Sequence, residues 1–222
     1  MEGELKVCDP VKVDHTKDME SWRVFKIMAE LVDGFDLLRK YRLAATFFGS
    51  ARNTLDPSVY AAAEELSRKL SQSGFAIITG GASGIMEAGN KGAFNAGGKS
   101  IGLNIKLQHE QGGNKYTTDS MTFNYFFTRR VMLAFESEVY VFFPGGYGTL
   151  DELFEILTLV QTNKIKRIPI VMYGKEYWAP LVAYIKGTLL KHQTINEEDL
   201  QLFQVVDSAD EAYEHILKSV KC

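Results

Sequence analysis

Short apolar runs alternate with longer segments of helical periodicity from about residue 43 to the end of the chain. Each run ends at glycine or polar residues, as buried strands of parallel sheets commonly do. The expected strands are Leu43–Phe48, Phe75–Thr79, Ser100–Asn104, Val139–Phe143, Ile168–Met172 and a short one near Phe203–Val206. The expected helices are Pro57–Gln72, Ile85–Asn95, Phe123–Ser137, Gly148–Thr162, Glu176–Leu190 and one from Ser208. This alternation predicts an α/β fold, a Rossmann-like doubly wound parallel sheet in three α/β/α layers.

Two segments stand outside this alternation. Apolar residues at helical spacing predict a helix over Lys17–Lys40, preceded by a loose arm. Because this helix precedes the first strand, it packs either on the outside of the sheet or on another subunit. Ile105–Ser120 is interpreted as a polar loop with Gly112 and Gly113, long enough to be a lid or rim. With no linker or repeat, residues 1–222 are expected to form one nucleotide-binding domain with an N-terminal arm and helix at about 1–40.

Composition narrows the class of protein. The 222 residues are 45% hydrophobic and 24% charged, which is ordinary globular usage, and the net charge of −3 without a dense basic stretch argues against a nucleic-acid partner. The two cysteines, Cys8 and Cys222, form neither a disulfide framework nor a metal knuckle, and the four histidines are scattered singly. No metal site is therefore expected. No apolar run is long enough to span a bilayer, so we expect a cytoplasmic protein without a membrane partner.

Three glycine-rich loops follow expected strands, namely Gly49-Ser50, Gly80–Gly84 and Pro144–Thr149. Glycine lets backbone N–H groups approach an anion closely, and the helix after each loop adds partial positive charge. Carboxyl ends of parallel strands share one edge of a sheet, so the three loops predict a phosphate site there. The Gly-x-Gly-x-x-Gly and Gly-x-x-x-x-Gly-Lys-Ser/Thr motifs are missing from the sequence, which favours a mononucleotide over a dinucleotide or a nucleoside triphosphate.

Two carboxylates near these loops allow two interpretations each. Thr149 and Glu152 have the spacing of a capping box, in which Glu152 would only start a helix. Alternatively, the phosphate binds the Gly145–Thr149 amides and Glu152 points toward the sugar. Glu87 lies in the first turn after Gly84, where it could either complement the helix dipole or contact the ligand.

Adjacent arginines occur on the expected helix Phe123–Ser137. Arg129 and Arg130 point in directions about 100° apart, so at most one is expected to face the site directly. Phe123, Phe126 and Phe127 fall at helical spacing and are interpreted as core or interface rather than as a base-stacking platform.

The pattern Pro-Gly-Gly-x-Gly-Thr-x-x-Glu at Pro144–Glu152 resembles the LOG (LONELY GUY) family of cytokinin riboside 5′-monophosphate phosphoribohydrolases, whose bacterial relatives carry the label "possible lysine decarboxylase". The resemblance extends from about Leu43 to Tyr173 and includes Gly49–Arg52, Thr79–Glu87 and the arginine pair.

This resemblance implies hydrolysis of the N-glycosidic bond of a nucleoside 5′-monophosphate, giving free base and ribose 5-phosphate without a cofactor. It implies Arg129 and Glu152 as the catalytic pair, and a homodimer or higher homo-oligomer with sites near the interface. The expected substrate-binding residues are Gly49, Ser50, Gly81, Gly84, Glu87, Arg130, Gly145, Gly146, Gly148 and Thr149.

The sequence departs from the plant pattern Met-His-Glu-Arg-Lys, where it has Phe126-Phe127-Thr128-Arg129-Arg130. This departure leaves three kinds of base open: a cytokinin, plain adenine or another purine. Two other functions remain open: a non-catalytic carrier of a phosphorylated nucleotide cofactor, and lysine decarboxylation, which needs pyridoxal phosphate on a lysine.

Overall fold

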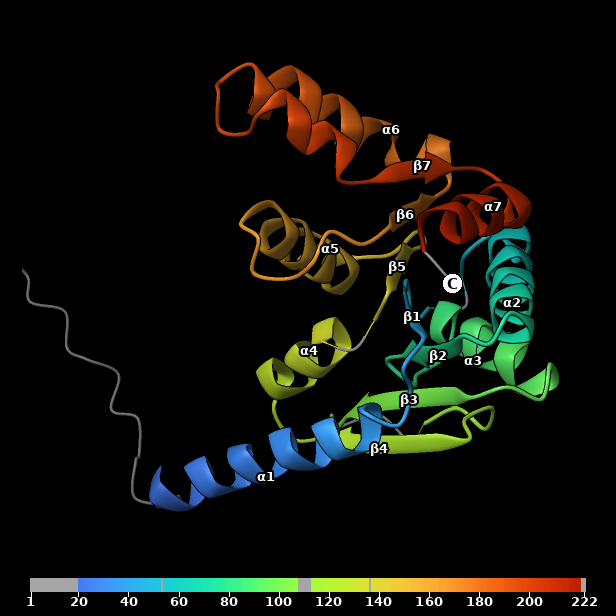
Figure 1. Ribbon diagram of the computed structural model, residues 1–222, viewed down its shortest axis with the longest axis vertical. Coiled ribbons are helices and arrows are strands. Elements are labelled where there is room, and N and C mark those ends of the chain that lie inside the picture. Colours follow the sequence, from blue (N-terminus) through green and yellow to red (C-terminus); the bar gives the residue numbers. More distant parts are fainter. Residues whose placement is uncertain (1–19, 53, 108–112, 136, 221–222) are drawn as a thin grey trace, which may run out of the picture.

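The computed structural model describes residues 20–52, 54–107, 113–135 and 137–220, which surround one seven-stranded parallel sheet (Figure 1). The strands are β1 (Ala44–Phe48), β2 (Ala76–Thr79), β3 (Ser100–Ile105), β4 (Asp119–Phe123), β5 (Val139–Phe142), β6 (Ile170–Tyr173) and β7 (Gln204–Val206). The order across the sheet is β4-β3-β2-β1-β5-β6-β7. The chain first winds from β1 to β4, then returns to place β5 beside β1 and winds the other way. The predicted doubly wound parallel sheet is thus confirmed, and its strand order reverses between β1 and β5.

Helices cover both faces of the sheet, which gives three layers (Figure 1). One face carries α1 (Glu20–Leu38), α4 (Phe126–Phe135), α5 (Tyr147–Gln161) and α6 (Lys175–Tyr184). The other carries α2 (Pro57–Gln72), α3 (Ile85–Asn95) and α7 (Ala209–Ser219). Strands β1, β2 and β5 are buried along their full length, because side chains on both of their faces enter one of two hydrophobic clusters.

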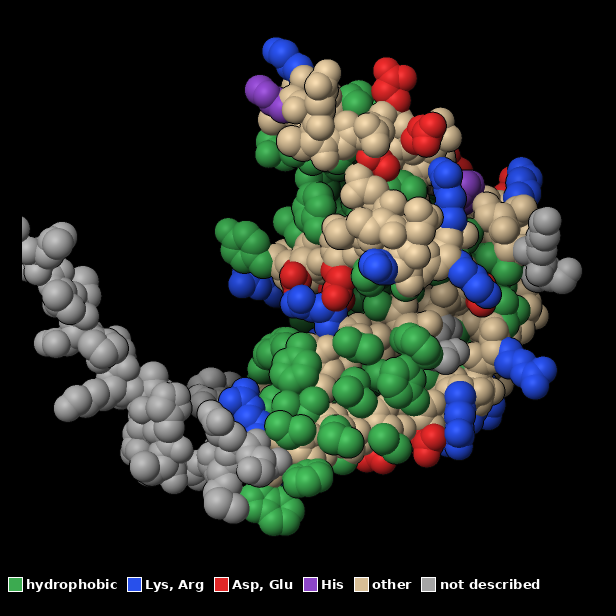
Figure 2. Space-filling view, turned by 60° about the vertical axis from the view of Figure 1, so that its left-hand side comes forward, with side chains coloured by type: hydrophobic (Ala, Val, Ile, Leu, Met, Phe, Trp, Pro, Cys, Tyr) green, Lys and Arg blue, Asp and Glu red, His purple; other side chains and the backbone are tan. Residues whose placement is uncertain are grey.

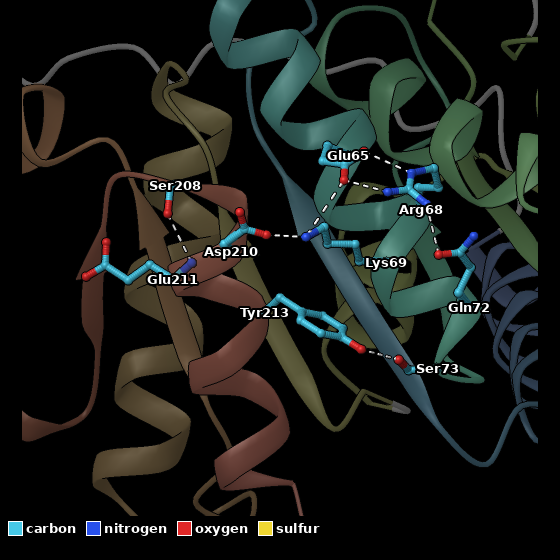
Figure 3. A network of polar contacts seen from close by, with 9 residues as sticks. All are labelled: Glu65, Arg68, Lys69, Gln72, Ser73, Ser208, Asp210, Glu211 and Tyr213. Atoms are coloured by element: carbon cyan, nitrogen blue, oxygen red, sulfur yellow. Dashed lines mark hydrogen bonds and ion pairs between the residues drawn. The ribbon is translucent and has the colours of Figure 1, made fainter.

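The last helix is fixed to the sheet through α2 (Figure 3). The Ser208 hydroxyl caps α7 by accepting from the Glu211 amide at 3.0 Å. Tyr213 then reaches Ser73, with 2.6 Å between the hydroxyl oxygens, and Lys69 pairs with Asp210. These contacts join α7, the last helix, to α2, which directly follows the first strand in the chain.

The expected loop Ile105–Ser120 is a loop in its described residues 106–107 and 113–118, but its ends belong to strands, Ile105 to β3 and residues 119–120 to β4, so the predicted bounds are wrong. β4 occupies Asp119–Phe123 at the edge of the sheet, and α4 begins at Phe126 rather than at Phe123. β4 alternates exposed and partly buried residues and contains no long apolar run. An edge strand buries less of its surface than a central one, which removes the signal on which the strand prediction depended. Residues 108–112 of this segment, including Gly112, lie outside the described residues.

The expected helix Glu176–Leu190 changes its hydrogen-bond pattern halfway. After α6, residues Ile185–Leu190 form a π-helical turn, and Pro180 lies inside α6. Apolar periodicity does not distinguish these two helix types over so short a length.

The N-terminal helix packs on the sheet side that α4 covers. Leu38 is fully buried, and Leu31 and Phe35 pack against the same hydrophobic cluster.

None of the described helices is long and apolar enough to cross a membrane. Cys8, Cys222, His15 and His109 lie outside the described residues, among which no group of His, Cys, Asp or Glu is arranged to hold a metal ion.

Candidate active site

Three glycine-containing loops meet at the carboxyl edge of the sheet, where the strand order reverses. The Ser50 amide after β1 donates to the Pro144 carbonyl after β5 at 3.0 Å. The Ser50 carbonyl in turn accepts from the Ile85 amide at 3.0 Å, at the end of the loop that follows β2. The predicted convergence of the loops is confirmed, and it lies where open α/β sheets bind their ligands.

The N-terminus of α5 is an anion-binding feature of this edge. Gly146 is its N-cap, and no side chain in the described part of the protein caps it. The N–H groups of a first helical turn have no intrahelical acceptor, and they carry partial positive charge. Gly145 lies so close to this turn that a Cβ atom there would collide with Thr149 Oγ1 and would lie 3.0 Å from the Ser50 amide nitrogen. Glycine at 145 is therefore required for the loop after β1 and the start of α5 to meet.

The capping-box interpretation of Thr149 and Glu152 is wrong. Because α5 begins at Tyr147, Thr149 lies inside its first turn instead of at the N-cap, and its side chain is buried. Glu152 lies further along the helix and lines a cavity. Its carboxylate is therefore available for another role.

A cavity of about 350 Å³ opens between the loops and helices α4 and α5, within the size range of small-molecule sites. The expected site residues that line it are Gly49, Ser50, Arg129, Arg130, Gly146, Gly148, Thr149 and Glu152. Gly80, from the expected turn Gly80–Gly84, also lines it, and the lining residues not expected at the site are Phe47, Phe48, Ala51, Arg52, Met86, Phe126, Leu133 and Asp151.

Glu152 has the most perturbed carboxylate at this cavity. Its Oε2 atom is enclosed and has no hydrogen-bond partner within the described residues. Desolvation is the main cause that raises the pKa of Glu152 to about 7; Arg129 opposes the shift and the charge of Glu155 adds to it. A carboxyl group with this pKa changes protonation near neutral pH, which is a property of catalytic acids and bases.

Arg129 is held by backbone carbonyls. Its Nε donates to the Leu103 carbonyl at 2.7 Å, and its Nη2 donates to the Gly80 carbonyl at 3.4 Å. A Cβ atom at position 80 would collide with the guanidinium. The absence of a side chain at Gly80 thus allows the guanidinium to reach the cavity wall, where its charge acts on Glu152.

Arg130 also lines the cavity, which differs from the expectation that only one arginine of the pair faces it directly. Arg130 forms an ion pair with Asp151, and its Nε lies 3.4 Å from Glu155 Oε2. Its charge is largely compensated by these α5 carboxylates. The two neighbouring arginines therefore differ: Arg129 is bound to backbone at the cavity wall, whereas Arg130 joins α4 to α5.

Four expected site residues do not line this cavity. Glu87 accepts a hydrogen bond from the Tyr60 hydroxyl at 3.1 Å, which holds its carboxylate against α2. Gly84 and Gly145 allow the loops to pack closely. A Cβ atom at Gly84 would collide with the Ser50 carbonyl, and one at Gly145 would collide with Thr149 Oγ1. Gly81 lies beside Asn104 of β3.

Among the unexpected residues, Arg52 follows directly on the loop of Ser50. Its amide donates to Ser50 Oγ at 3.1 Å, and its exposed side chain forms no ion pair within the described residues. The sequence signal for it was its place next to Gly49-Ser50. Met86 and Asp151 had no such signal, because nothing in their spacing separates them from ordinary helix residues.

Comparison with known proteins identifies relatives of this chain. A family model described as "possible lysine decarboxylase" matches residues 86–216. A probable cytokinin riboside 5′-monophosphate phosphoribohydrolase, LOGL5 of Oryza sativa subsp. japonica, is 30% identical over 154 residues, covering 66% of this chain and 60% of the relative. The phosphoribohydrolase LOG1 of Arabidopsis thaliana is 29% identical over 149 residues, covering 66% of this chain and 70% of the relative. The cytokinin riboside 5′-monophosphate phosphoribohydrolase of Rhodococcoides fascians is 25% identical over 127 residues, covering 56% and 64%. The match with the first rice relative thus spans only about three fifths of that protein's length.

Solved structures share the fold at lower identity. The Moco carrier protein of Chlamydomonas reinhardtii superposes with a TM-score of 0.61 at 20% identity, covering 80% of this chain and 96% of that one. A molybdenum cofactor binding protein of Rippkaea orientalis superposes with a TM-score of 0.58 at 20% identity, covering 79% and 94%. The family match extends over more than half of the described chain and includes Arg129 and the Pro144–Glu152 motif. The chain therefore belongs to the family described as possible lysine decarboxylases, which includes the LOG cytokinin riboside 5′-monophosphate phosphoribohydrolases.

Proposed function

We propose that this protein hydrolyses the N-glycosidic bond of a purine or cytokinin nucleoside 5′-monophosphate, releasing the free base and ribose 5-phosphate. The observation that carries the proposal is the Glu152 carboxyl group, which lines the cavity together with Arg129 and whose enclosed Oε2 atom has no hydrogen-bond partner among the described residues. It lies on α5, whose N-terminus opens to the same cavity and is capped by no described side chain. The names of the LOG relatives supply the substrate class.

The phosphate would bind at the start of α5. Gly146, Gly148 and Thr149 line the cavity there, and the positive end of the helix dipole favours a dianion. Arg52 and Ser50 line the same cavity and add a cation and a hydroxyl donor. A phosphate held at this end places the attached ribose beside the next turn of α5, which carries Glu152.

Bond cleavage would pass through a ribose with oxocarbenium character, as in glycoside hydrolysis generally. Positive charge then develops at C1′, and a fixed carboxylate stabilises this state more than the ground state. Glu152 in its ionised form supplies that charge and orients the attacking water. Arg129 is always protonated, so it holds the nucleotide and Glu152 in register and does not transfer a proton.

The test is incubation with AMP and with isopentenyladenosine monophosphate, with free base followed by chromatography. We expect release of base from at least one of them. Glu152→Gln should reduce turnover by about 10²- to 10³-fold, the scale for one preorganised electrostatic group, and should retain AMP binding. Glu155→Gln is the matched control on the same helix and should keep most of the turnover, because Glu155 does not line the cavity.

Full activity in Glu152→Gln would overturn the assignment of this residue. Binding of AMP without release of base, by the unaltered protein, would overturn hydrolysis and favour a carrier of a phosphorylated nucleotide cofactor. A carrier is the function named for the Moco proteins that share this fold.

A second copy of the chain is the proposed partner. Hydrophobic side chains gather on the face formed by α1 and α4 (Figure 2), with Trp22, Phe25, Met28, Val32, Phe126, Phe127, Val131 and Phe135 each more than 40% exposed. Patches of this kind on a protein surface mark interaction sites. Phe126 belongs both to this face and to the cavity wall, so a symmetric contact through the face would bring the partner close to the cavity.

A further inference from the structure

A second cavity, of about 410 Å³, adjoins the first at the carboxyl ends of β3 and β4. The two cavities share Ala51, Gly80, Met86 and Arg129 in their walls. Arg129 therefore stands at their junction. One ligand of the length of a nucleotide can extend from the start of α5, past Arg129, into the second cavity.

The polar side chain of Asn104 lies in the wall of this second cavity. Asn104 lies near the end of β3, and in the register of the sheet its backbone is opposite Thr122 of β4. Its carboxamide makes no hydrogen bond with any described residue. Its neighbours differ in this respect: Asn114 Nδ2 donates to the Gly81 and Ala82 carbonyls at 3.1 and 3.0 Å, and the Asn90 oxygen accepts from Thr79 Oγ1 at 2.6 Å.

The backbone around Asn104 leaves room for its carboxamide. A Cβ atom at Gly81 would collide with Asn104 Oδ1, and one at Gly113 would lie 2.8 Å from the same oxygen. Gly81 has a φ of +73°, a conformation that favours glycine in any case. Two glycines thus enclose an amide whose donor and acceptor are both unused within the described residues.

We propose that the second cavity is the base subsite and that Asn104 selects 6-aminopurines. The inference deepens the proposed function and rests on it. A carboxamide presents one donor and one acceptor side by side, which matches N7 and the N6–H of adenine. Guanine and hypoxanthine present two acceptors on that edge, O6 and N7, so they can take only one hydrogen bond from the amide.

The other walls fit a flat ring. Met86, Ile105 and Leu107 supply apolar surface, and Thr122 and Lys106 lie at the polar side. An adenine substituted at N6 keeps one N6–H, so the pairing with Asn104 holds for cytokinin-type bases as well. The phosphate at α5, C1′ at Glu152 and the base at Asn104 then follow one another in the order of the nucleotide.

The experiment measures binding by calorimetry in the Glu152→Gln background, where hydrolysis does not interfere. The probes are AMP, GMP and ribose 5-phosphate, which lacks a base. Asn104→Leu, which has nearly the same shape, should weaken AMP binding by about 10- to 100-fold, the scale of one bidentate base contact. It should leave ribose 5-phosphate binding unchanged. Thr162→Val, at the exposed C-terminal end of α5 and away from both cavities, is the control and should change AMP binding less than about threefold.

Unchanged AMP binding in Asn104→Leu would overturn the proposal, and so would equal weakening of AMP and ribose 5-phosphate. Asn104→Asp is the second variant in case the first does not fold. It keeps the shape and exchanges the donor for an acceptor, so adenine N7 loses its donor and AMP binding should weaken by about tenfold or more, with ribose 5-phosphate binding unchanged; unchanged AMP binding would overturn the proposal.

These outcomes are distinct from failure of the proposed function. If the unaltered protein binds AMP better than GMP and ribose 5-phosphate, and Asn104 controls that difference, the base subsite stands even when no base is released. If base is released and Asn104→Leu cleaves AMP as fast as the unaltered protein, hydrolysis stands and the base subsite is overturned.

Discussion

Glu30 of α1 accepts a hydrogen bond from the Thr128 hydroxyl of α4 at 2.6 Å. The same carboxylate accepts from the Asn124 amide at 2.7 Å, so it caps the start of α4 from another helix. Burial alone would raise the pKa of Glu30, but the hydrogen bonds from Thr128 and Asn124 outweigh it and hold that pKa below its ordinary value. Arg129 follows Thr128 directly, so the N-terminal helix takes part in placing the proposed catalytic arginine.

Glu30→Gln should lower the free energy of unfolding at pH 7 by about 1–3 kcal/mol, the scale for a buried charge-assisted hydrogen bond. Because the pKa of Glu30 is lowered in the folded state, its ionised form stabilises the protein above the unfolded-state pKa. That stabilisation is lost as the pH falls through the folded-state pKa. Urea unfolding at pH 7 and at acidic pH measures the difference. The exposed Asp33 on the same helix gives the control Asp33→Asn, and equal effects of the two substitutions would contradict the capping role.

The activity should depend on the protonation of Glu152. Since its pKa is raised to about 7 and the carboxylate is the active form, kcat/KM should rise with pH through about 7. Glu155→Gln removes a like charge that raises this pKa, and it leaves the Arg130 charge less compensated. The midpoint of the pH profile should therefore move to lower pH. A profile that falls above pH 7 would instead assign Glu152 as a general acid.

Glu152→Gln should make the protein more stable at pH 8. The folded-state pKa of Glu152 is above the unfolded-state value, so its ionisation costs stability as the pH rises between the two values. The cost reaches about 1–3 kcal/mol above pH 7 on the basis of 1.36 kcal/mol per pKa unit. Denaturant unfolding at pH 8 and at pH 4.5 should show a gain for the variant at pH 8 alone. An equal gain in unfolding free energy at both pH values would contradict this prediction, because it would come from packing of the glutamine and not from removal of the charge.

Gly80→Ala should reduce kcat/KM by about tenfold or more. The added Cβ would collide with the Arg129 guanidinium and lie 2.6 Å from Met86 Sδ, so the arginine would have to move. Gly187→Ala provides the control, because a Cβ atom there meets nothing within 4 Å. Steady-state kinetics on both variants decide the matter, and unchanged kcat/KM in Gly80→Ala would show that this position of Arg129 is unimportant.

Phe25→Glu should dissociate the proposed homo-oligomer. Phe25 is 61% exposed in the centre of the α1 part of the apolar face, where a buried charge would be unfavourable. Phe94 on α3 is 45% exposed on the opposite side of the sheet, so Phe94→Glu is the control. Sedimentation velocity should show an oligomer for the unaltered protein and the control, and a smaller species for Phe25→Glu. A monomer in all three would contradict the proposed contact.

The sequence predicted the sheet and the edge at which the loops meet, because buried strands and glycine loops leave local signals. It did not predict the edge strand β4, in which four of the five residues are exposed or only partly buried. It also suggested a capping box at Thr149 and Glu152, since that spacing is correct only if Thr149 is the N-cap of the helix. The actual start at Tyr147 depends on how Gly145 packs against the loop after β1, which is a long-range contact.

Burial is the other property that sequence spacing could not supply. Glu152 and Glu155 are both carboxylates of α5, yet Glu152 lines the cavity and Glu155 does not. The difference follows from the rotation of α5 about its axis, which is set by packing of Leu153 and Ile156 into the core. Asn104 was overlooked for the same reason, as a polar residue at the end of an otherwise apolar strand.

The carbonyls that hold Arg129 belong to the backbones of Gly80 and Leu103. A backbone acceptor is present whatever residue occupies position 103, so exchange of Leu103 for another core residue does not remove the bond. Alanine substitution of Leu103 would therefore not remove the hydrogen bond from Arg129 Nε. The anchor can persist through extensive divergence of the surrounding side chains, as long as the two strand ends keep their places.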